Sequence, residues 1–211
     1  TTYGYAGSCF GDVIWVEVTV SWDIRSVVRS YTSVLRCSGE GIVEDVYFGQ
    51  LLRQEPGGLI LSSLNTIVNS RADQTAHRTL DCSVIRVVAS FMAFIFPVRD
   101  RAGVFARLSA AVESELGVNS FSARRIRRMF SSFWWQTFLF ETLFRKLSPQ
   151  VVIVSDSGER AVIAACRRSN IRVVELQHGV FAENDPDCLP FGAFDGGNEE
   201  ALLLPDVLAL Y

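Results

Sequence analysis

Residues 151–179, with the sequence VVIVSDSGERAVIAACRRSNIRVVELQHG, predict a β-strand, an α-helix and a second β-strand in succession. Val151–Val154 is a continuous β-branched run, which is typical of a strand buried on both faces of a parallel sheet. Residues 159–168 place their apolar side chains on one helical stripe, and residues 171–176 form a second apolar strand. The connection is long enough for the right-handed crossover of a parallel pair. This segment therefore predicts an α/β fold, with a parallel sheet and helices on both of its faces.

The rest of the chain adds further elements to this fold. Residues 12–22 alternate between apolar and polar side chains, which predicts a strand with one face toward the core and the other toward solvent. Residues 59–64 are a short apolar run and predict another strand. The spacing of apolar residues predicts helices over residues 24–35, 46–52, 102–116 and 121–147, and the chain closes on an apolar strand at residues 207–211.

Residues 83–98 are the most apolar stretch of the sequence, SVIRVVASFMAFIFPV. A membrane-spanning helix needs about 20 residues, and this stretch is shorter and contains Arg86 and Pro97. We therefore predict a buried strand or a core helix here and not a membrane span.

The composition is that of an ordinary folded domain. The chain has 211 residues, of which 49% are hydrophobic and 20% are charged, and this excludes intrinsic disorder. Its net charge of −3 gives no overall attraction to nucleic acid, so we predict no nucleic-acid partner. The five cysteines show no CxxC or CxxH spacing, which favours a reduced, cytoplasmic setting without disulfides or a zinc site. We expect no metal and no cofactor.

Both ends of the sequence suggest a longer protein. The first residues include neither an initiating Met nor the basic and hydrophobic regions of a secretory signal. At the other end, the apolar strand at residues 207–211 stops with the chain. We therefore expect residues 1–211 to be a single domain that is a fragment of a longer chain.

Polar residues follow both strands of the 151–179 segment, at the strand ends where ligands of open α/β sheets gather. Seven of them are candidate site residues: Ser155, Ser157 and Gly158 after the first strand, and Glu175, Gln177, His178 and Gly179 at the end of the second. Helix capping accounts for much of the first cluster, because neither a GxGxxG nor a GKS/T phosphate-binding motif is present. We expect the chemistry to be carried by His178 alone. The other six residues of the two clusters are expected to contact the substrate.

His178 is the candidate catalytic residue. A strand-end imidazole can act as a general base near neutral pH, or it can donate a hydrogen bond to a sugar hydroxyl or a phosphate. The alternative is a histidine that only satisfies backbone groups at the rim of the sheet. The other histidine, His77, stands in an unpatterned polar segment, where we expect it to face solvent. No calcium loop matches the spacing of the acidic residues Glu183, Asp185, Asp187 and Asp195, so we assign no metal to them.

The helix predicted over residues 121–147 begins with a basic cluster of Arg124, Arg125, Arg127 and Arg128. One interpretation is a core helix with a solvated basic start, because the sheet must be covered by a helix in any case. The other is a basic surface that rests on anionic lipid or on a phosphate-rich ligand. The second interpretation predicts peripheral contact with the inner face of the membrane.

Three segments resemble the GT-B glycosyltransferases of bacterial surface-carbohydrate and capsular-polysaccharide biosynthesis. They are KLSPQV at residues 146–151, IRVVELQHG at residues 171–179 and PDVLALY at residues 205–211, which recur in this order in that group. The DVYFG sequence at residues 45–49 also resembles a D-x-Y/F-F/W-G segment of such chains. The resemblance covers about the last third of the chain, and ELQHG is its core.

The resemblance implies a two-domain enzyme with its cleft between two Rossmann-like halves. This chain would be the N-terminal, acceptor-side half, and a nucleotide-sugar donor would bind mainly to the other half. Gln177, His178 and Gly179 would line the cleft with support from Glu175, and a glycan would be the acceptor. Two alternatives remain open: a nucleotide-sugar epimerase of the same architecture, and a non-catalytic sugar- or nucleotide-binding module of a polysaccharide assembly complex.

Overall fold

The computed structural model describes nine segments of the chain, which together hold one parallel sheet and the helices around it. The segments are residues 24–30, 35–37, 43–45, 48–55, 57–62, 78–117, 121–155, 158–177 and 203–210. The strand predicted at residues 12–22 lies outside them.

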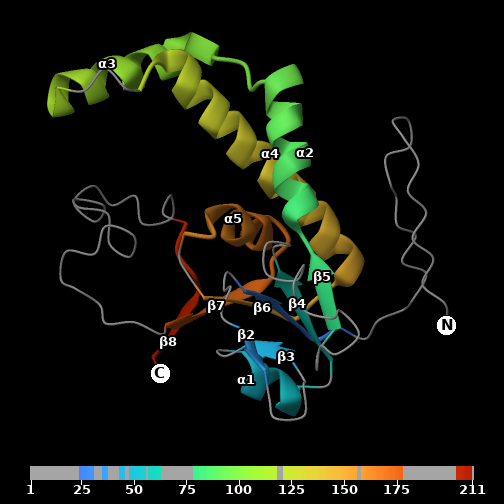
Figure 1. The fold of residues 1–211 in the computed structure, drawn as a ribbon. Coiled ribbons are helices and arrows are strands. Elements are labelled where there is room, and N and C mark those ends of the chain that lie inside the picture. Colours follow the sequence, from blue (N-terminus) through green and yellow to red (C-terminus); the bar gives the residue numbers. More distant parts are fainter. Residues whose placement is uncertain are drawn as a thin grey trace.

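The central sheet has six strands in the order β5-β4-β1-β6-β7-β8, and every pairing is parallel (Figure 1). This is the strand order of the doubly wound, Rossmann-like fold, and it confirms the predicted α/β architecture. A separate antiparallel pair joins β2 (Leu35–Cys37) to β3 (Val43–Asp45). The six strands are β1 (Ser26–Arg29), β4 (Gly58–Ser62), β5 (Arg78–Asp81), β6 (Val151–Val154), β7 (Arg172–Gln177) and β8 (Val207–Leu210).

Helices cover both faces of the sheet, as predicted. On one face, α1 (Gly49–Gln54) packs its neighbour Phe48 and its own Leu52 against Val28 and Ile60. The other face carries α2 (Ser83–Ile95), α4 (Ala123–Leu147) and α5 (Arg160–Arg168), which form the larger core with β1, β4, β6 and β7 (Figure 1). Cys166 is fully buried in that core as a free thiol.

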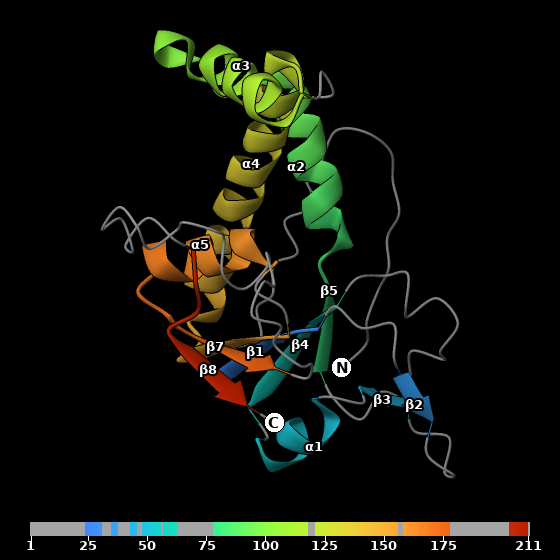
Figure 2. The same ribbon diagram turned by 90° about the vertical axis from the view of Figure 1, so that its left-hand side faces the viewer.

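The helix α4 begins and ends at recognisable signals. Ser122 accepts a hydrogen bond from the backbone N–H of Arg125, and Ser148 adopts a left-handed conformation (φ 47°) immediately before Pro149. The apolar stripe predicted for this helix is buried only in its C-terminal half, where Phe140 and Phe144 enter the core. The N-terminal half extends beyond the sheet (Figure 2).

The helix predicted over residues 24–35 is wrong. The structure has the buried strand β1 at Ser26–Arg29 and a second strand, β2, at Leu35–Cys37. Apolar residues three and four apart occur by chance over so short a stretch, and β1 is specified instead by its pairing with β4 on one side and β6 on the other.

Residues 83–98 contain the helix α2. The prediction that this stretch is buried is correct for one side of the helix and wrong for the other. Ala89 and Ala93 pack inward, whereas Val87 and Phe94 are both 68% exposed. After α2 the chain passes through a short 3-10 helix, η3 (Arg101–Gly103), into α3 (Val104–Leu116), which packs on α4. Figure 2 shows α2, α3 and the N-terminal half of α4 rising together away from the sheet, and we call this projection the helical arm. None of the helices in the described segments combines the length and apolarity that a membrane span requires.

Replacing Phe144 by Ala tests the position of the core. Its ring is fully buried between α4 and the sheet, so the substitution should lower the free energy of unfolding by about 3–5 kcal/mol. Phe138→Ala is the matched control, because that ring is 44% exposed on the same helix and should cost less than about 1.5 kcal/mol. Urea denaturation followed by circular dichroism measures both, and equal losses would contradict the packing described.

Candidate functional site

The strand order reverses between β1 and β6. From β1 the sheet continues through β4 and β5 to one edge, and from β6 it continues through β7 and β8 to the other. The connections after β1 and β6 therefore leave in opposite directions, and in open α/β sheets this point at the carboxyl ends of the strands is where ligands bind. In this chain it lies beyond Arg29 and Val154.

One row of residues crosses the sheet at that level. The pairing register aligns Leu61, Arg29, Val154 and Glu175 on the adjacent strands β4, β1, β6 and β7. The row two residues earlier, which includes Val27, packs into the core on the side of α4 and α5, so the alternation of strand side chains places Arg29 and Glu175 on that same side. Both are buried, with exposed fractions of 1% and 5%. Two opposite charges therefore flank β6 at the carboxyl edge.

Arg29 is the centre of a buried polar network. Its Nε donates to Glu159 Oε1 at 2.9 Å, and its Nη1 donates to the carbonyl oxygen of Leu61 at 3.2 Å. The same Nη1 lies 3.0 Å from Cys82 Sγ, whose thiol donates to the carbonyl oxygen of Ser62 at 2.9 Å. One guanidinium thus joins β1, the end of β4, the residue before α2 and the residue before α5.

Glu159 occupies the position immediately before α5. Its side chain makes no capping hydrogen bond to that helix. Its carboxylate binds Arg29 instead and also lies 3.7 Å from Nη2 of Arg86 on α2. A negative charge near a helix N-terminus is favoured by the helix dipole, so Glu159 occupies the region where α5 would otherwise attract an anion.

Cys82 is a structural thiol and not a nucleophile. Burial raises its pKa above the ordinary value, and the negative charges of Glu159 and Asp81 act in the same direction. Arg29 opposes this shift without reversing it. The thiol therefore stays protonated at neutral pH, which is the form that can donate to Ser62.

A second polar group lies toward α1, on the other side of the sheet. Ser30 Oγ donates to Asp45 Oδ2, and Asp45 Oδ1 accepts the backbone N–H of Phe48 at 3.0 Å. Phe48 is fully buried against Val28. The DVYFG segment therefore has a structural role here, because its Asp fixes the entry of α1 and its Phe fills the core beneath that helix.

Ser155 is the polar side chain at the switch point that the described structure leaves without a hydrogen-bond partner. It directly follows β6 and is 4% exposed. Within the described segments, its Oγ finds neither donor nor acceptor. An unsatisfied buried hydroxyl costs about 1–3 kcal/mol, so this oxygen is well suited to bind a ligand hydroxyl.

The structure describes four of the seven predicted site residues. Ser155 and Glu175 are buried at the carboxyl edge, Gly158 is exposed in the turn before α5, and Gln177 is the last residue of β7. Ser157, His178 and Gly179 lie outside the described segments. The same holds for His77 and for the acidic residues Glu183, Asp185, Asp187 and Asp195. The part of the chain that is described contains no cluster of three or more side chains suited to a metal ion.

The sequence interpretation missed the charged centre of this edge. The spacing of apolar residues assigns Arg29 to a helix, and it gives Glu159 no role beyond the start of the helix predicted over residues 159–168. The missed signal is the similarity of SVVRS at residues 26–30 to VVIVS at residues 151–155, two short β-branched runs that each end on Ser. Recognising the first run as a strand would have placed Arg29 and Ser30 beside Ser155.

A double-mutant cycle tests the buried ion pair. Arg29→Met alone should lower the free energy of unfolding by about 3–5 kcal/mol, because it leaves the Glu159 carboxylate buried without its main partner. Adding Glu159→Leu should recover most of that loss, since two apolar side chains can replace a buried ion pair at little net cost. Additive losses, measured by urea denaturation, would show that the two side chains do not interact.

The pKa of Cys82 reports on the same network. Glu159→Gln should move the pH profile of Cys82 alkylation to lower pH, because it removes a negative charge that raises this pKa. Arg29→Met should move the profile to higher pH, because it removes a positive charge that lowers it. Iodoacetamide labelling from pH 7 upward, read by peptide mass spectrometry, separates Cys82 from Cys166, whose pKa burial raises to about 12. Profiles that do not move would place Cys82 outside the network.

Comparisons of the chain with protein-family models, curated proteins and solved structures find no match in any of the three. Nothing known of another protein is therefore transferred to this chain by similarity of that kind. Any proposal of function therefore rests on the geometry of the carboxyl edge and on the resemblance described in the sequence analysis.

Proposed function

We propose that this chain is the acceptor-side half of a GT-B glycosyltransferase, which moves a sugar from a nucleotide-activated donor to a glycan acceptor in surface-polysaccharide biosynthesis. The supporting observation is the set of buried polar groups at the switch point between β1 and β6, where Ser155 Oγ has no partner among the described residues. The ELQHG sequence, whose Glu175 lies at this edge, supplies the link to sugar transfer through its resemblance to GT-B glycosyltransferases.

The charges at the edge favour a neutral ligand over a phosphate. The buried carboxylate of Glu159 stands before α5, and Glu175 adds a second buried carboxylate two strands from Arg29. Carboxylates accept hydrogen bonds from sugar hydroxyls, whereas they repel phosphate oxygens. A glycan acceptor therefore suits this edge, and the proposal assigns the donor nucleotide to the other half of the enzyme.

His178 is the proposed general base. In the sequence it is the residue directly after Gln177, the last residue of β7. That strand ends at the same carboxyl edge as β6. A neutral imidazole there would take the proton from the acceptor hydroxyl as that oxygen attacks the anomeric carbon of the donor sugar. The bond between that carbon and the nucleotide would break in the same step, and the nucleotide would leave with the bonding electrons. Gln177 and Gly179 would line the same region.

Ligand binding by the purified chain tests which class of molecule the edge accepts. We expect oligosaccharides from a glycan array to bind, and UDP-glucose and GDP-mannose to bind weakly or not at all. Ser155→Ala should weaken oligosaccharide binding about three- to tenfold, the usual contribution of one neutral hydrogen bond. Ser169→Ala is the matched control, because Ser169 Oγ is also buried without a partner among the described residues but lies at the far end of α5. Binding of the nucleotide sugars alone would contradict an acceptor role and would favour a nucleotide-binding module.

Turnover tests the assignment of His178. In the enzyme assayed with both its halves, His178→Ala should lower the rate of sugar transfer at least about a hundredfold, the usual contribution of a general base, with no change in melting temperature. Product analysis with donor alone provides the second readout, since formation of an epimeric nucleotide sugar would instead identify an epimerase. Unchanged turnover in the variant would remove His178 from the mechanism.

A further inference from the structure

The outer face of α2 is a continuous apolar stripe. The exposed fractions include 60% for Val84, 68% for Val87, 60% for Phe91 and 68% for Phe94. These residues follow one another at steps of three and four, so they share one side of the helix. The whole stripe comprises Val84, Val87, Val88, Phe91, Phe94 and Ile95, and Phe96 continues it beyond the helix.

This stripe is not the core-facing side of α2. The opposite side carries Ala89 and Ala93, which are buried against α4, and Ile85, which packs on the main core. Arg86 is the single charged residue of the helix, and it points to Glu159. Large exposed apolar patches on a folded protein mark surfaces that bind a partner or a membrane.

The end of α2 is held firmly on α4. The backbone N–H of Val98 donates to Ser131 Oγ at 3.0 Å, and Arg127 Nε donates to the carbonyl oxygen of Val98 at 2.7 Å. Trp135 Nε1 donates to the carbonyl oxygen of Phe96 at 3.0 Å. The arm therefore presents its apolar stripe on a fixed support. Arg127, one of the four arginines at the start of α4, thus ties that helix to the segment that follows α2.

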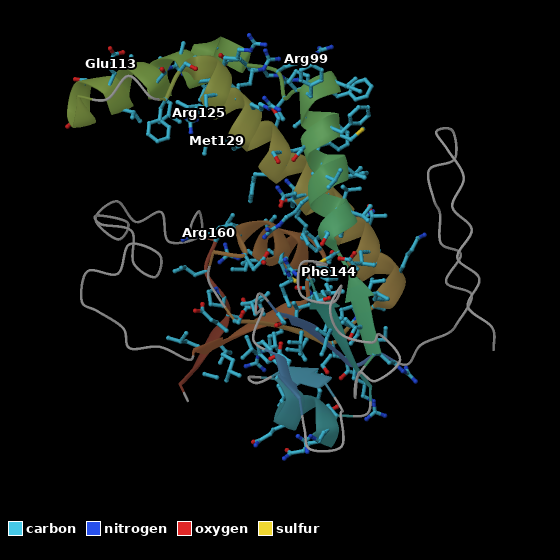
Figure 3. The ribbon with its side chains drawn as sticks, in the orientation of Figure 1. Arg99, Glu113, Arg125, Met129, Phe144 and Arg160 are labelled. Carbon is cyan, nitrogen blue, oxygen red and sulfur yellow. The ribbon has the colours of Figure 1, made fainter. Side chains whose placement is uncertain are left out.

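Arginines gather around the tip of the arm. Arg99 lies at the top of α2, and Arg125 lies in the N-terminal half of α4 near Met129 (Figure 3). Met129 is itself 56% exposed. Residues 96–130 contain seven arginines and only three carboxylates, although the chain as a whole has a net charge of −3. Besides Arg127, the arginines of this region are Arg99, Arg101, Arg107, Arg124, Arg125 and Arg128, all of them exposed.

We propose that the helical arm docks on an anionic lipid surface, with the outer face of α2 in the interface and the arginines of its tip against the lipid headgroups. An exposed apolar helix face next to clustered arginines is the combination that binds such surfaces. α2 is too short to cross the bilayer, so it lies on the membrane. This inference is independent of the proposed sugar transfer.

A second copy of the chain fits the stripe less well. The 13 residues of α2 hold fewer than two heptads, whereas a coiled-coil seam needs about three or four. A parallel pairing of two arms would also bring their arginines together. The lipid surface satisfies both the apolar stripe and the positive charge.

Vesicle co-sedimentation tests this proposal with the whole chain. We expect binding to phosphatidylcholine vesicles that contain phosphatidylglycerol, little binding to pure phosphatidylcholine, and weaker binding as salt rises. Val87→Glu and Phe94→Glu should each weaken binding at least about tenfold, because each removes apolar contact and adds a charge that the lipid repels. Leu208→Glu is the matched control, since Leu208 is exposed on β8 and away from the arm, and it should leave binding unchanged.

The contribution of the arginines to vesicle binding is tested separately. Arg124→Gln with Arg128→Gln should weaken binding to anionic vesicles about thirtyfold, because each arginine near such a surface contributes about 1 kcal/mol. Arg172→Gln, which removes an exposed charge at the start of β7, should change binding by no more than about threefold. Sedimentation velocity without lipid measures whether the chain forms a dimer. The lipid assignment would be overturned if the chain is a dimer that Val87→Glu converts to a monomer and if it does not bind vesicles.

Discussion

The ion pair between Arg29 and Glu159 is the interaction on which the organisation of this protein depends. It joins the first strand of the sheet to the start of α5, across 130 residues of sequence. Through Cys82 and the carbonyl oxygen of Leu61 it also fixes the end of β4 and the start of α2. Because both charges are buried, removing either partner would lower the stability of the fold strongly. The pair therefore holds the carboxyl edge of the sheet in one arrangement, and that edge is where a ligand would bind.

The sequence predicts the C-terminal half of the fold well and the N-terminal half poorly, for a physical reason. Val151–Val154 and the helix at Arg160–Arg168 carry their own periodicity, so local pattern suffices. The strand β1 is as short as β6 but ends on the charged Arg29, and its identity follows from two neighbours that are distant in the sequence. The same limit applies to the site. The strong strand patterns place Ser155 and Glu175 at the carboxyl edge of the sheet, whereas the incorrect helix prediction gives no such position to Arg29.

The outer face of α2 shows a second limit of sequence patterns. Residues 83–98 are apolar enough to predict burial, and no local signal separates the side formed by Ala89 and Ala93 from the side formed by Val87 and Phe94. Only the packing of α2 on α4 makes that distinction. The resulting molecule has two distinct regions, a polar edge of the sheet and an apolar, basic arm. In the proposed function the arm would hold the protein at the membrane, where glycan acceptors of surface polysaccharides are assembled.

Hydrogen–deuterium exchange of the purified chain, with and without a saturating mixture of oligosaccharides, tests the central claim most directly. The claim is that the carboxyl edge between β1 and β6 is the ligand site. Added oligosaccharide should slow exchange in peptides that contain residues 26–30 and 155–163 and leave α2 unchanged. Protection confined to other peptides, or no protection at ligand concentrations that saturate binding, would contradict the claim.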